Sequence, residues 1–354
     1  MRLLVIGGSV FLGQAFAAEA LARGWEVTTF NRGKSAADLP GVRVVRGDRE
    51  QPEDLARLAA AGPWDAVVDV CGYVPRVVGA SVAALAESAA SYLFVSSINA
   101  YPGFPAEPVD ERSPRHACAP DAGPEDGDYG VLKAGCERAV VRGFPGRTLV
   151  LQPGLIMGPG DRARRLTWWL RRAAQGGRMA APGRPQQEMQ LIDARDLAAF
   201  GLDRIEAGDG AVGGGEAGGG GTEGGVSYLV GGSPANTTWG EYLGTCVEVT
   251  GGKAEPVWMD DGFLLAHEVA PWVELPLWAP REEDFAAVWQ HSSAKAAGAG
   301  LRCRPVTESI RDTAAWLFAP GGLEEAFGDY RATGDRGLSP EKEQQLLADW
   351  DARS

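Results

Sequence analysis

Short runs of apolar residues alternate with longer amphipathic stretches over the first 155 residues of the chain. The runs are typical of strands buried on both faces, and the stretches between them, such as 52–61 and 77–90, are typical of helices. Regular alternation of the two predicts an α/β fold, in which a doubly wound parallel sheet is covered by helices on both sides. The predicted strands are residues 2–6, 26–30, 42–46, 66–70, 92–96 and 148–152.

The strand pattern weakens after residue 155. A further core strand is predicted at 226–230, and the chain beyond it is rich in tryptophan, since nine of the eleven tryptophans lie from Trp168 on. We interpret these rings as core packing, with an apolar pocket wall as the alternative. We therefore expect two parts: a sheet-containing core formed by 1–154 and continued by 190–232, and a smaller C-terminal region formed by 155–189 and 233–354.

Two segments have the composition of loops. Residues 102–128 are rich in proline, glycine and acidic side chains, and they are predicted to form a long loop or lid. Residues 208–225 contain eleven glycines in eighteen positions, which predicts a flexible surface loop. A glycine loop that cradles phosphate would need a following helix and a lysine, and neither follows this segment.

Acidic residues outnumber basic ones by 47 to 34, which gives a formal net charge of -13 at pH 7. A chain with this charge repels phosphate backbones, so no nucleic-acid partner is expected. No apolar run reaches the ~18 residues of a membrane span, and the N-terminus continues directly into a strand, so we expect neither membrane insertion nor secretion. Five cysteines without a C-x-x-C pair and three scattered histidines predict no metal site and a reducing, cytoplasmic location.

The first predicted strand continues into "GGSVFLG", residues 7–13, and then into a helix-like segment. A strand, a glycine turn and a helix in this order place the free N–H groups of the helix N-terminus where a dinucleotide pyrophosphate binds. Two glycines hold the outer places of the turn, but a valine holds the middle one. We expect the turn still to bind the cofactor, with weaker phosphate contact, through Gly7, Ser9, Val10, Phe11, Leu12 and Gly13.

The second strand leads to Asn31, eighteen residues after Gly13, where NAD-binding proteins usually carry an acid for the ribose 2′-hydroxyl. Asn31 removes that negative charge and Arg32 adds a positive one. NADP(H) is therefore favoured, and NAD(H) stays an alternative. Asp48, after the third strand, is a candidate acceptor for the adenine amino group, or else a helix cap.

Candidate catalytic residues follow the fifth strand and open a later helix. Ser97 ends "YLFVSS", and Tyr129 and Lys133 lie four residues apart in "YGVLK", on one face of a helix. Hydride transfer to a carbonyl leaves an alkoxide that needs a proton, and a phenol supplies one more readily when a nearby ammonium stabilises the phenolate. A serine hydroxyl can donate to the same oxygen as its charge develops.

On these motifs the chain resembles the short-chain dehydrogenase/reductase superfamily, and within it the extended and atypical branch of NAD(P)-dependent epimerases and dehydratases. Besides the glycine turn, the resemblance rests on "NRG" at 31–33, "GD" at 47–48, "VSSINAY" at 95–101, "YGVLK" at 129–133, "QPGLIMGPGD" at 152–161 and "QLIDARDLA" at 190–198. It implies a Rossmann-type NAD(P)-binding core followed by a smaller substrate-binding region. The catalytic residues would be Ser97, Tyr129 and Lys133.

The resemblance also implies contacts to the cofactor and the substrate. Lys133 would hold the nicotinamide ribose, and Pro153 and Gly154 would border the nicotinamide. The substrate would lie where simple packing is the competing interpretation, near Asn99, Tyr101, Trp168, Trp169 and Gln190.

The sequence thus predicts an NADP(H)-dependent oxidoreductase that interconverts a carbonyl and a hydroxyl on a small molecule. The sugar-nucleotide dehydratases of that branch carry an acid pair where this chain has Ile98 and Asn99, so a dehydratase is not expected. Two alternatives stay open: a sugar-nucleotide epimerase, and a non-catalytic nucleotide- or RNA-binding protein on the same fold. A homodimer is compatible with each of them.

Overall fold

The structure, a computed structural model, describes residues 1–212, 226–281, 283–328 and 336–353. The chain divides into two compact units, each assembled from three separate segments. Unit 1 contains residues 1–154, 194–231 and 290–302, and unit 2 contains residues 155–193, 232–289 and 303–354. The sequence analysis had grouped residues 290–302 with the C-terminal region.

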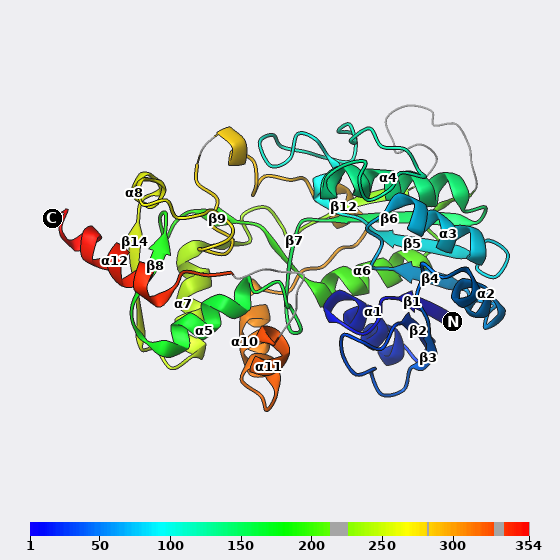
Figure 1. Cartoon of the computed structure of the whole chain (residues 1–354), viewed down its shortest axis with the longest axis horizontal. Coiled ribbons are helices and arrows are strands. Elements are labelled where there is room, and N and C mark those ends of the chain that lie inside the picture. The colour runs from blue at the N-terminus through cyan, green and yellow to red at the C-terminus, as the bar shows by residue number, and fades with distance from the viewer. Residues whose placement is uncertain (213–225, 282, 329–335, 354) are drawn as a thin grey trace. The chain divides into compact units, whose positions relative to one another are not determined.

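Unit 1 is built on a parallel sheet whose strands match the apolar runs of the sequence (Figure 1). All seven predicted strands are confirmed, with boundaries that shift by at most one residue. A short strand, β11 (Ala211–Val212), pairs antiparallel with the start of β6. The parallel strands, in order across the sheet, are β3 (Arg43–Arg46), β2 (Glu26–Asn31), β1 (Arg2–Ile6), β4 (Ala66–Asp69), β5 (Ser91–Val95), β6 (Arg147–Pro153) and β12 (Val226–Val230).

Helices cover both faces of this sheet. Helix α3 packs against α4 on one face, and α1 packs against α6 on the other (Figure 1). The strands between them are apolar on both sides; Leu3, Leu4 and Val5 of β1, for example, are completely buried. The helices of unit 1 are α1 (Phe11–Ala22), α2 (Pro52–Ala60), α3 (Pro75–Leu85), α4 (Tyr129–Gly143), α6 (Ala194–Glu206) and α9 (Ala294–Gly298), with a 3₁₀ turn η1 (Ile98–Ala100) after β5.

One predicted helix ends earlier than its composition suggested. The Ala-rich stretch 77–90 predicts a helix to residue 90, but α3 ends at Leu85. The backbone of Trp64 bonds to Ser88 O at 2.7 Å and to Ala90 N at 3.1 Å. This parallel bridge leads the chain into β5, so tertiary pairing overrides the local preference for helix.

The two loop predictions have different outcomes. Residues 102–128 contain no helix or strand, as predicted for a long loop. Of the glycine-rich segment 208–225, only 208–212 belong to the described residues, and they include β11; residues 213–225 lie outside the described part of the chain.

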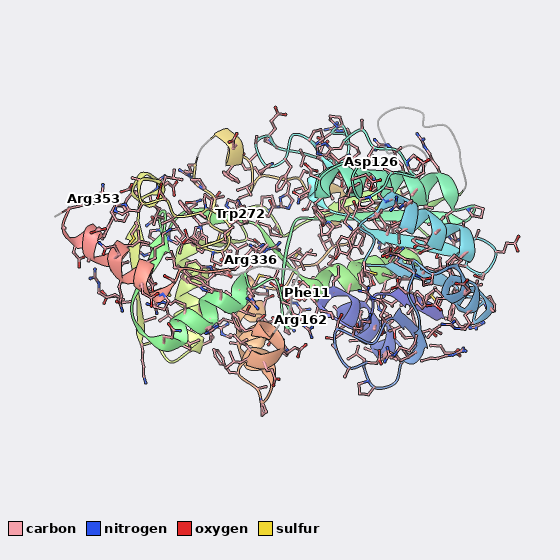
Figure 2. The ribbon with its side chains drawn as sticks, viewed as in Figure 1. Phe11, Asp126, Arg162, Trp272, Arg336 and Arg353 are labelled. Carbon is pink, nitrogen blue, oxygen red and sulfur yellow. The ribbon has the colours of Figure 1, made fainter. Side chains whose placement is uncertain are left out.

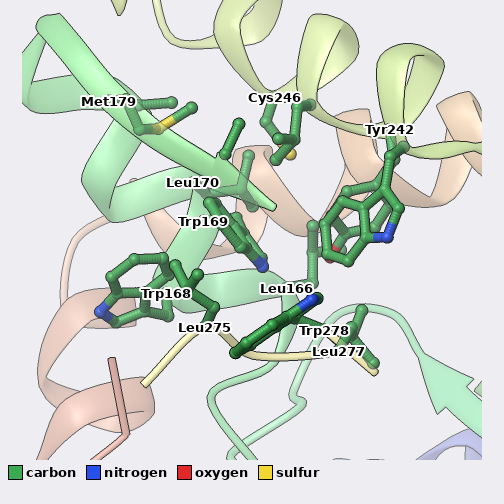
Figure 3. Close-up of a cluster of buried hydrophobic side chains, with 14 of the residues drawn as sticks. Leu166, Trp168, Trp169, Leu170, Met179, Tyr242, Cys246, Leu275, Leu277 and Trp278 are labelled. Atoms are coloured by element: carbon green, nitrogen blue, oxygen red, sulfur yellow. The ribbon is translucent and has the colours of Figure 1, made fainter. Parts of the chain in front are cut away.

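Unit 2 packs helices around a tryptophan-rich core (Figure 3). Trp169, Trp239 and Trp278 are fully buried, which confirms the core-packing interpretation for these rings. The strands are short: β7 (Leu155–Met157) with β10 (Leu191–Asp193), β8 (Gly177–Pro182) with β14 (Ala254–Met259), and β9 (Glu188–Met189) with β13 (Thr237–Thr238). The helical elements are α5 (Leu166–Gln175), α7 (Trp239–Val249), α8 (Asp261–Ala266), η2 (Glu283–Phe285), α10 (Val306–Leu317), α11 (Gly322–Phe327) and α12 (Pro340–Asp351).

Over the residues that the structure describes, no helix combines the length and the apolar composition that crossing a membrane requires.

Candidate active site

The glycine turn between β1 and α1 is held by close backbone packing. Gly7 has φ +92°, in the left-handed region that favours glycine, and a Cβ built on it would lie 2.8 Å from the Cys71 sulfur. A Cβ on Gly13 would collide with the Gly7 carbonyl oxygen and lie 2.9 Å from the Gly8 Cα. The helix therefore sits directly on the turn only because these positions carry no side chain.

The N-terminus of α1 has no side-chain cap. Val10 is the N-cap residue and its side chain cannot cap the helix. Phe11, labelled in Figure 2, is the first residue of the helix and has φ +42°. Ser9 of the turn and Leu12 of the helix are buried. The first-turn N–H groups that no side chain caps are suited to an anionic group such as pyrophosphate. Val10 thus leaves the helix terminus available, although it narrows the approach that glycine would allow.

The end of β2 carries a polar cluster, of which the sequence predicted only Asn31. Asn31 accepts the Gly33 N–H at 2.9 Å and also bonds to Arg46, and its amide donates to Asp38 at 3.0 Å. Arg46 forms an ion pair with Asp38 and keeps the pKa of that carboxyl below its usual value. A carboxylate, Asp38, therefore lies beside Asn31, but the Arg46 guanidinium from β3 neutralises its charge.

Arg32 and Asp48 lie next to this cluster. The Arg32 side chain is 57% exposed and its guanidinium is 3.7 Å from the Asp48 carboxylate. Asp48 also accepts the Glu50 N–H at 3.1 Å. Exposed pairs at such distances are weak and rearrange easily, so Arg32 is available to a ligand.

The pair Tyr129 and Lys133 opens α4. Asp128 is the N-cap and accepts the Val131 N–H at 3.0 Å, which starts the helix at Tyr129. Tyr129 is 47% exposed, whereas Lys133 is 2% exposed. The Lys133 nitrogen lies 6.0 Å from the centre of the Tyr129 ring. A buried cation and an accessible phenol thus share one face of the helix, one turn apart.

Backbone carbonyls at two strand ends hold the Lys133 ammonium. It donates to Gly72 O at 2.8 Å, just past β4, and to Val95 O at 2.9 Å, at the end of β5. An ammonium has three N–H donors. Two of them bond to these carbonyls, and the third has no hydrogen-bond partner among the residues that the structure describes.

Ser97 follows β5 directly and caps η1. Its hydroxyl oxygen accepts the Asn99 N–H at 3.2 Å. This bond uses a lone pair of the oxygen, so the hydroxyl proton can turn toward a substrate oxygen. Val95 O, which holds Lys133, is only two residues earlier. The carboxyl end of β5 therefore supports both the serine and the lysine.

Tyr73 is a neighbour of this site that the sequence analysis missed. It follows Gly72, is 57% exposed, and its ring centre lies 6.4 Å from that of Tyr129 and 5.2 Å from the Lys133 nitrogen. Its place just after the fourth strand was the available signal, because ligands of such sheets bind beyond the carboxyl ends of strands.

The expected neighbours of the nicotinamide and the substrate have varied surroundings. Pro153 ends β6, and Gly154 donates its N–H to Val230 O at 3.0 Å; a Cβ on Gly154 would lie 2.5 Å from His291, so only glycine fits there. Asn99 is partly buried, and Tyr101 is fully buried with its hydroxyl on Gln152 at 3.1 Å.

The remaining three expected substrate neighbours belong to unit 2 and are buried. The Trp169 indole donates to Pro276 O at 2.8 Å, and Trp168 packs beside it in the hydrophobic core. Gln190 donates to Gly232 O at 2.8 Å. Trp168 and Trp169 thus belong to the hydrophobic core of unit 2, and Gln190 is fully buried. Among the described residues, no three or more His, Cys, Asp and Glu side chains gather as a metal site would need.

Comparison with known proteins gives a consistent picture. The family model described as "NAD dependent epimerase/dehydratase family" matches residues 3–214, more than half of the chain. Among curated proteins, the 2′-dehydrokanamycin reductase of Streptomyces kanamyceticus is 33% identical over 141 residues, 40% of this chain and 38% of that protein. The 2-alkyl-3-oxoalkanoate reductase of Stenotrophomonas maltophilia is 28% identical over 221 residues, 56% of this chain and 64% of that protein. The chain thus matches less than two thirds of the length of either relative.

Solved structures share the fold at low sequence identity. The Bordetella bronchiseptica enzyme WbmH, solved with NAD+, matches with a TM-score of 0.66 at 15% identity, over 90% of this chain and 99% of its own. The UDP-glucose 4-epimerase of Thermotoga maritima, solved with UDP-glucose, matches with a TM-score of 0.63 at 16% identity, over 90% of this chain and 98% of its own. Similarity at this level describes the fold alone.

Proposed function

Since the chain belongs to the NAD-dependent epimerase/dehydratase family, as its motifs predicted, we propose that it is an NADP(H)-dependent oxidoreductase that interconverts a carbonyl and a hydroxyl on a small molecule. The predicted family and Rossmann-type fold are confirmed. The observation that carries the proposal is the exposed Tyr129 phenol one helical turn from the buried Lys133 ammonium, which donates to Val95 O two residues before Ser97.

The chain's own residues account for the proton in this reaction. A bound nicotinamide cofactor would supply or accept the hydride. In the reducing direction, Tyr129 gives its phenolic proton to the oxygen of the carbonyl carbon that receives the hydride, while Ser97 donates a hydrogen bond to that oxygen. The phenolate that remains is stabilised by Lys133 and takes a proton back from water, which reaches it because Tyr129 is half exposed.

The glycine turn supports a dinucleotide as the cofactor. The turn excludes a Cβ at Gly7 and Gly13, and the N-terminus of α1 has no side-chain cap. Both features suit a pyrophosphate against the backbone. Val10 weakens this contact without removing it.

The polar cluster after β2 supports NADP(H) over NAD(H). Asn31 carries no charge, and the carboxylate next to it, Asp38, is neutralised by Arg46. Arg32 is exposed and pairs only loosely with Asp48, so its guanidinium can turn to a 2′-phosphate. The cluster therefore favours a doubly negative group over a neutral hydroxyl.

Net carbonyl reduction is favoured over epimerisation by the two curated relatives, both of which are named as reductases. The epimerases among the solved structures support the fold only, because their identity to this chain is low. An epimerase would hold its nicotinamide through purification and would show no net oxidation of added NADPH. A reductase consumes NADPH in proportion to the carbonyl supplied.

The test is NADPH oxidation with a panel of small ketones and aldehydes, followed by Tyr129→Phe on whichever substrate is reduced. The variant loses one hydroxyl of an exposed side chain, so its melting temperature and NADPH affinity should hold. Turnover should fall by about 10²–10⁴, the scale of a lost general acid. Tyr228→Phe is the matched control, because it removes a hydroxyl that bonds to Asp209 at 2.9 Å. Full activity of Tyr129→Phe would refute the proposed role.

A further inference from the structure

The third turn of α4 carries a buried carboxylate, Glu137, on the helix face that also holds Tyr129 and Lys133. Glu137 is 2% exposed. Its oxygens accept the Ser96 hydroxyl at 2.5 Å, the Gln152 amide at 3.0 Å and the Arg115 guanidinium at 3.3 Å. Every partner comes from a different segment of unit 1.

A second layer of contacts extends this network to the loop after η1. The Tyr101 hydroxyl donates to the Gln152 side-chain oxygen at 3.1 Å, and the Arg115 guanidinium lies 3.8 Å from the centre of the Tyr101 ring. Arg115 also donates to Ser113 O at 2.8 Å. Residues 101–116 are therefore attached to α4 and β6 through Glu137 and Gln152.

Burying a carboxylate at this position has an unfavourable desolvation free energy. Taking a charge out of water costs several kcal/mol after relaxation, and apolar residues of the same volume often stabilise a core as well or better. The Arg115 guanidinium and the neutral donors Ser96 and Gln152 offset this cost by forming hydrogen bonds to the Glu137 carboxylate. What it provides that an apolar side chain would not is directional contact with Ser96, the residue immediately before Ser97.

We infer that Glu137 is a positioning residue for the reaction proposed above. Its bond to Ser96 fixes the peptide that carries the Ser97 hydroxyl, and its place two turns after Tyr129 fixes that peptide relative to the phenol. Its ion pair with Arg115 attaches residues 101–116 to the same helix. Glu137 touches no reacting atom in this assignment, and acts through Ser96, Gln152 and Arg115.

The inference rests on the proposed function and is tested with two serines of the same region. Ser96→Ala removes the hydroxyl bonded to Glu137, and Ser91→Ala removes one bonded to Asp65 O at 3.0 Å. Both serines are buried; Ser91 begins β5, and Ser96 follows its last residue. Ser96→Ala loses a bond to a buried carboxylate and Ser91→Ala loses one to a neutral carbonyl, so the melting temperature should fall further in Ser96→Ala.

The two variants should differ in local order and in turnover. Backbone hydrogen exchange of the full-length protein should quicken over 97–104 in Ser96→Ala and stay unchanged there in Ser91→Ala. With the carbonyl substrate found above, kcat should fall by about 10- to 100-fold in Ser96→Ala, the scale of a small displacement in a reacting pair. NADPH affinity should hold in both, which separates displacement of Ser97 from loss of the cofactor site.

A double variant that moves the carboxylate from position 137 to position 152 tests whether kcat can be rescued. Glu137→Gln should lower kcat like Ser96→Ala, because two amides then face each other. Adding Gln152→Glu returns one carboxylate and one amide to the network and should recover most of the loss. Equal exchange over 97–104 in the two serine variants, or an equal fall in kcat, would overturn the inference. If the unaltered protein reduces no carbonyl, the proposed function fails, while the exchange result still decides whether Glu137 orders the Ser97 segment.

Discussion

Replacing Lys133 by methionine should separate the two tasks of this side chain, support of the backbone and contact with the cofactor. Methionine keeps the unbranched stem and removes the ammonium. The Gly72 and Val95 carbonyl oxygens then lose the donors that now lie at 2.8 and 2.9 Å. The Val95 carbonyl lies at the end of β5 and the Gly72 carbonyl lies just past the end of β4, both at the candidate site.

The structure sets the size of the effect on stability. A hydrogen bond from a charged donor contributes about 1.5–3 kcal/mol net, and the burial cost of the ammonium, which disappears in the variant, offsets part of two such bonds. We expect a loss of about 2–4 kcal/mol in the free energy of unfolding. For a unit of this size that is a fall in melting temperature of roughly 5–15 °C.

The third N–H of Lys133 sets the effect on binding. If it reaches the cofactor ribose, its loss should weaken NADPH binding by about 10- to 100-fold, the equivalent of one charge-assisted hydrogen bond. Fluorescence titration with NADPH and thermal unfolding of the free protein measure the two effects separately. Turnover should fall as well, because the phenolate of Tyr129 loses its neighbouring cation.

Lys295→Met is the matched control for this variant. Lys295 also belongs to unit 1 and donates to a backbone carbonyl, Ser227 O at 2.7 Å. Its removal should lower the melting temperature by a smaller amount and leave NADPH affinity unchanged. If Lys133→Met unfolds at the wild-type temperature, the two carbonyl bonds do not stabilise the fold. If it is destabilised yet binds NADPH normally, Lys133 does not reach the cofactor.

Two further predictions concern charge. Arg32→Ala should narrow the preference for NADPH over NADH, because it removes an exposed cation beside the place of the 2′-phosphate; equal affinities of the unaltered protein for both cofactors would contradict the preference itself. Burial lowers the pKa of His291 to about 4. Below the ordinary histidine pKa of about 6.5, His291 therefore binds a proton in the unfolded chain but stays neutral in the folded one. Lowering the pH from 7 to 5 should thus reduce the free energy of unfolding by about 2 kcal/mol. Thermal unfolding at pH 7 and pH 5 should show a smaller difference for His291→Gln than for the unaltered protein, and equal differences would place this pH dependence elsewhere.

Much of unit 1 could be predicted from the sequence because its strands are buried on both faces. Such strands require continuous apolar runs, and these runs gave every parallel strand of the sheet within one residue. Unit 2 offered no comparable pattern. Its strands β9 and β13 have two residues each, and pairs that short depend on contacts between distant segments rather than on local sequence.

The candidate site likewise contains features that the sequence predicts and contacts that it does not. Spacing alone placed Tyr129 and Lys133 on one helical face, because four residues make one turn. No spacing rule could show that Asp38 bonds to Asn31 and pairs with Arg46, or that Glu137 meets Ser96, Gln152 and Arg115. These contacts join segments that lie far apart or in different loops, so they appear only once the chain has folded.

The segment order of unit 1 has a consequence for the way the protein is made. Residues 1–154 emerge first, yet β12, which completes the sheet beside β6, and α6, which covers α1, belong to 194–231, and the last segment of the unit is 290–302. At about 5–20 residues per second, roughly 4–15 s separate the synthesis of residue 154 from that of residue 230, where β12 ends. During this interval the nascent chain exposes the open edge of β6, which is a template for wrong pairing with other chains. Expression of residues 1–154 alone should therefore give an aggregating product, and the yield of the whole protein should depend on how well the cell shields that edge until β12 has been made.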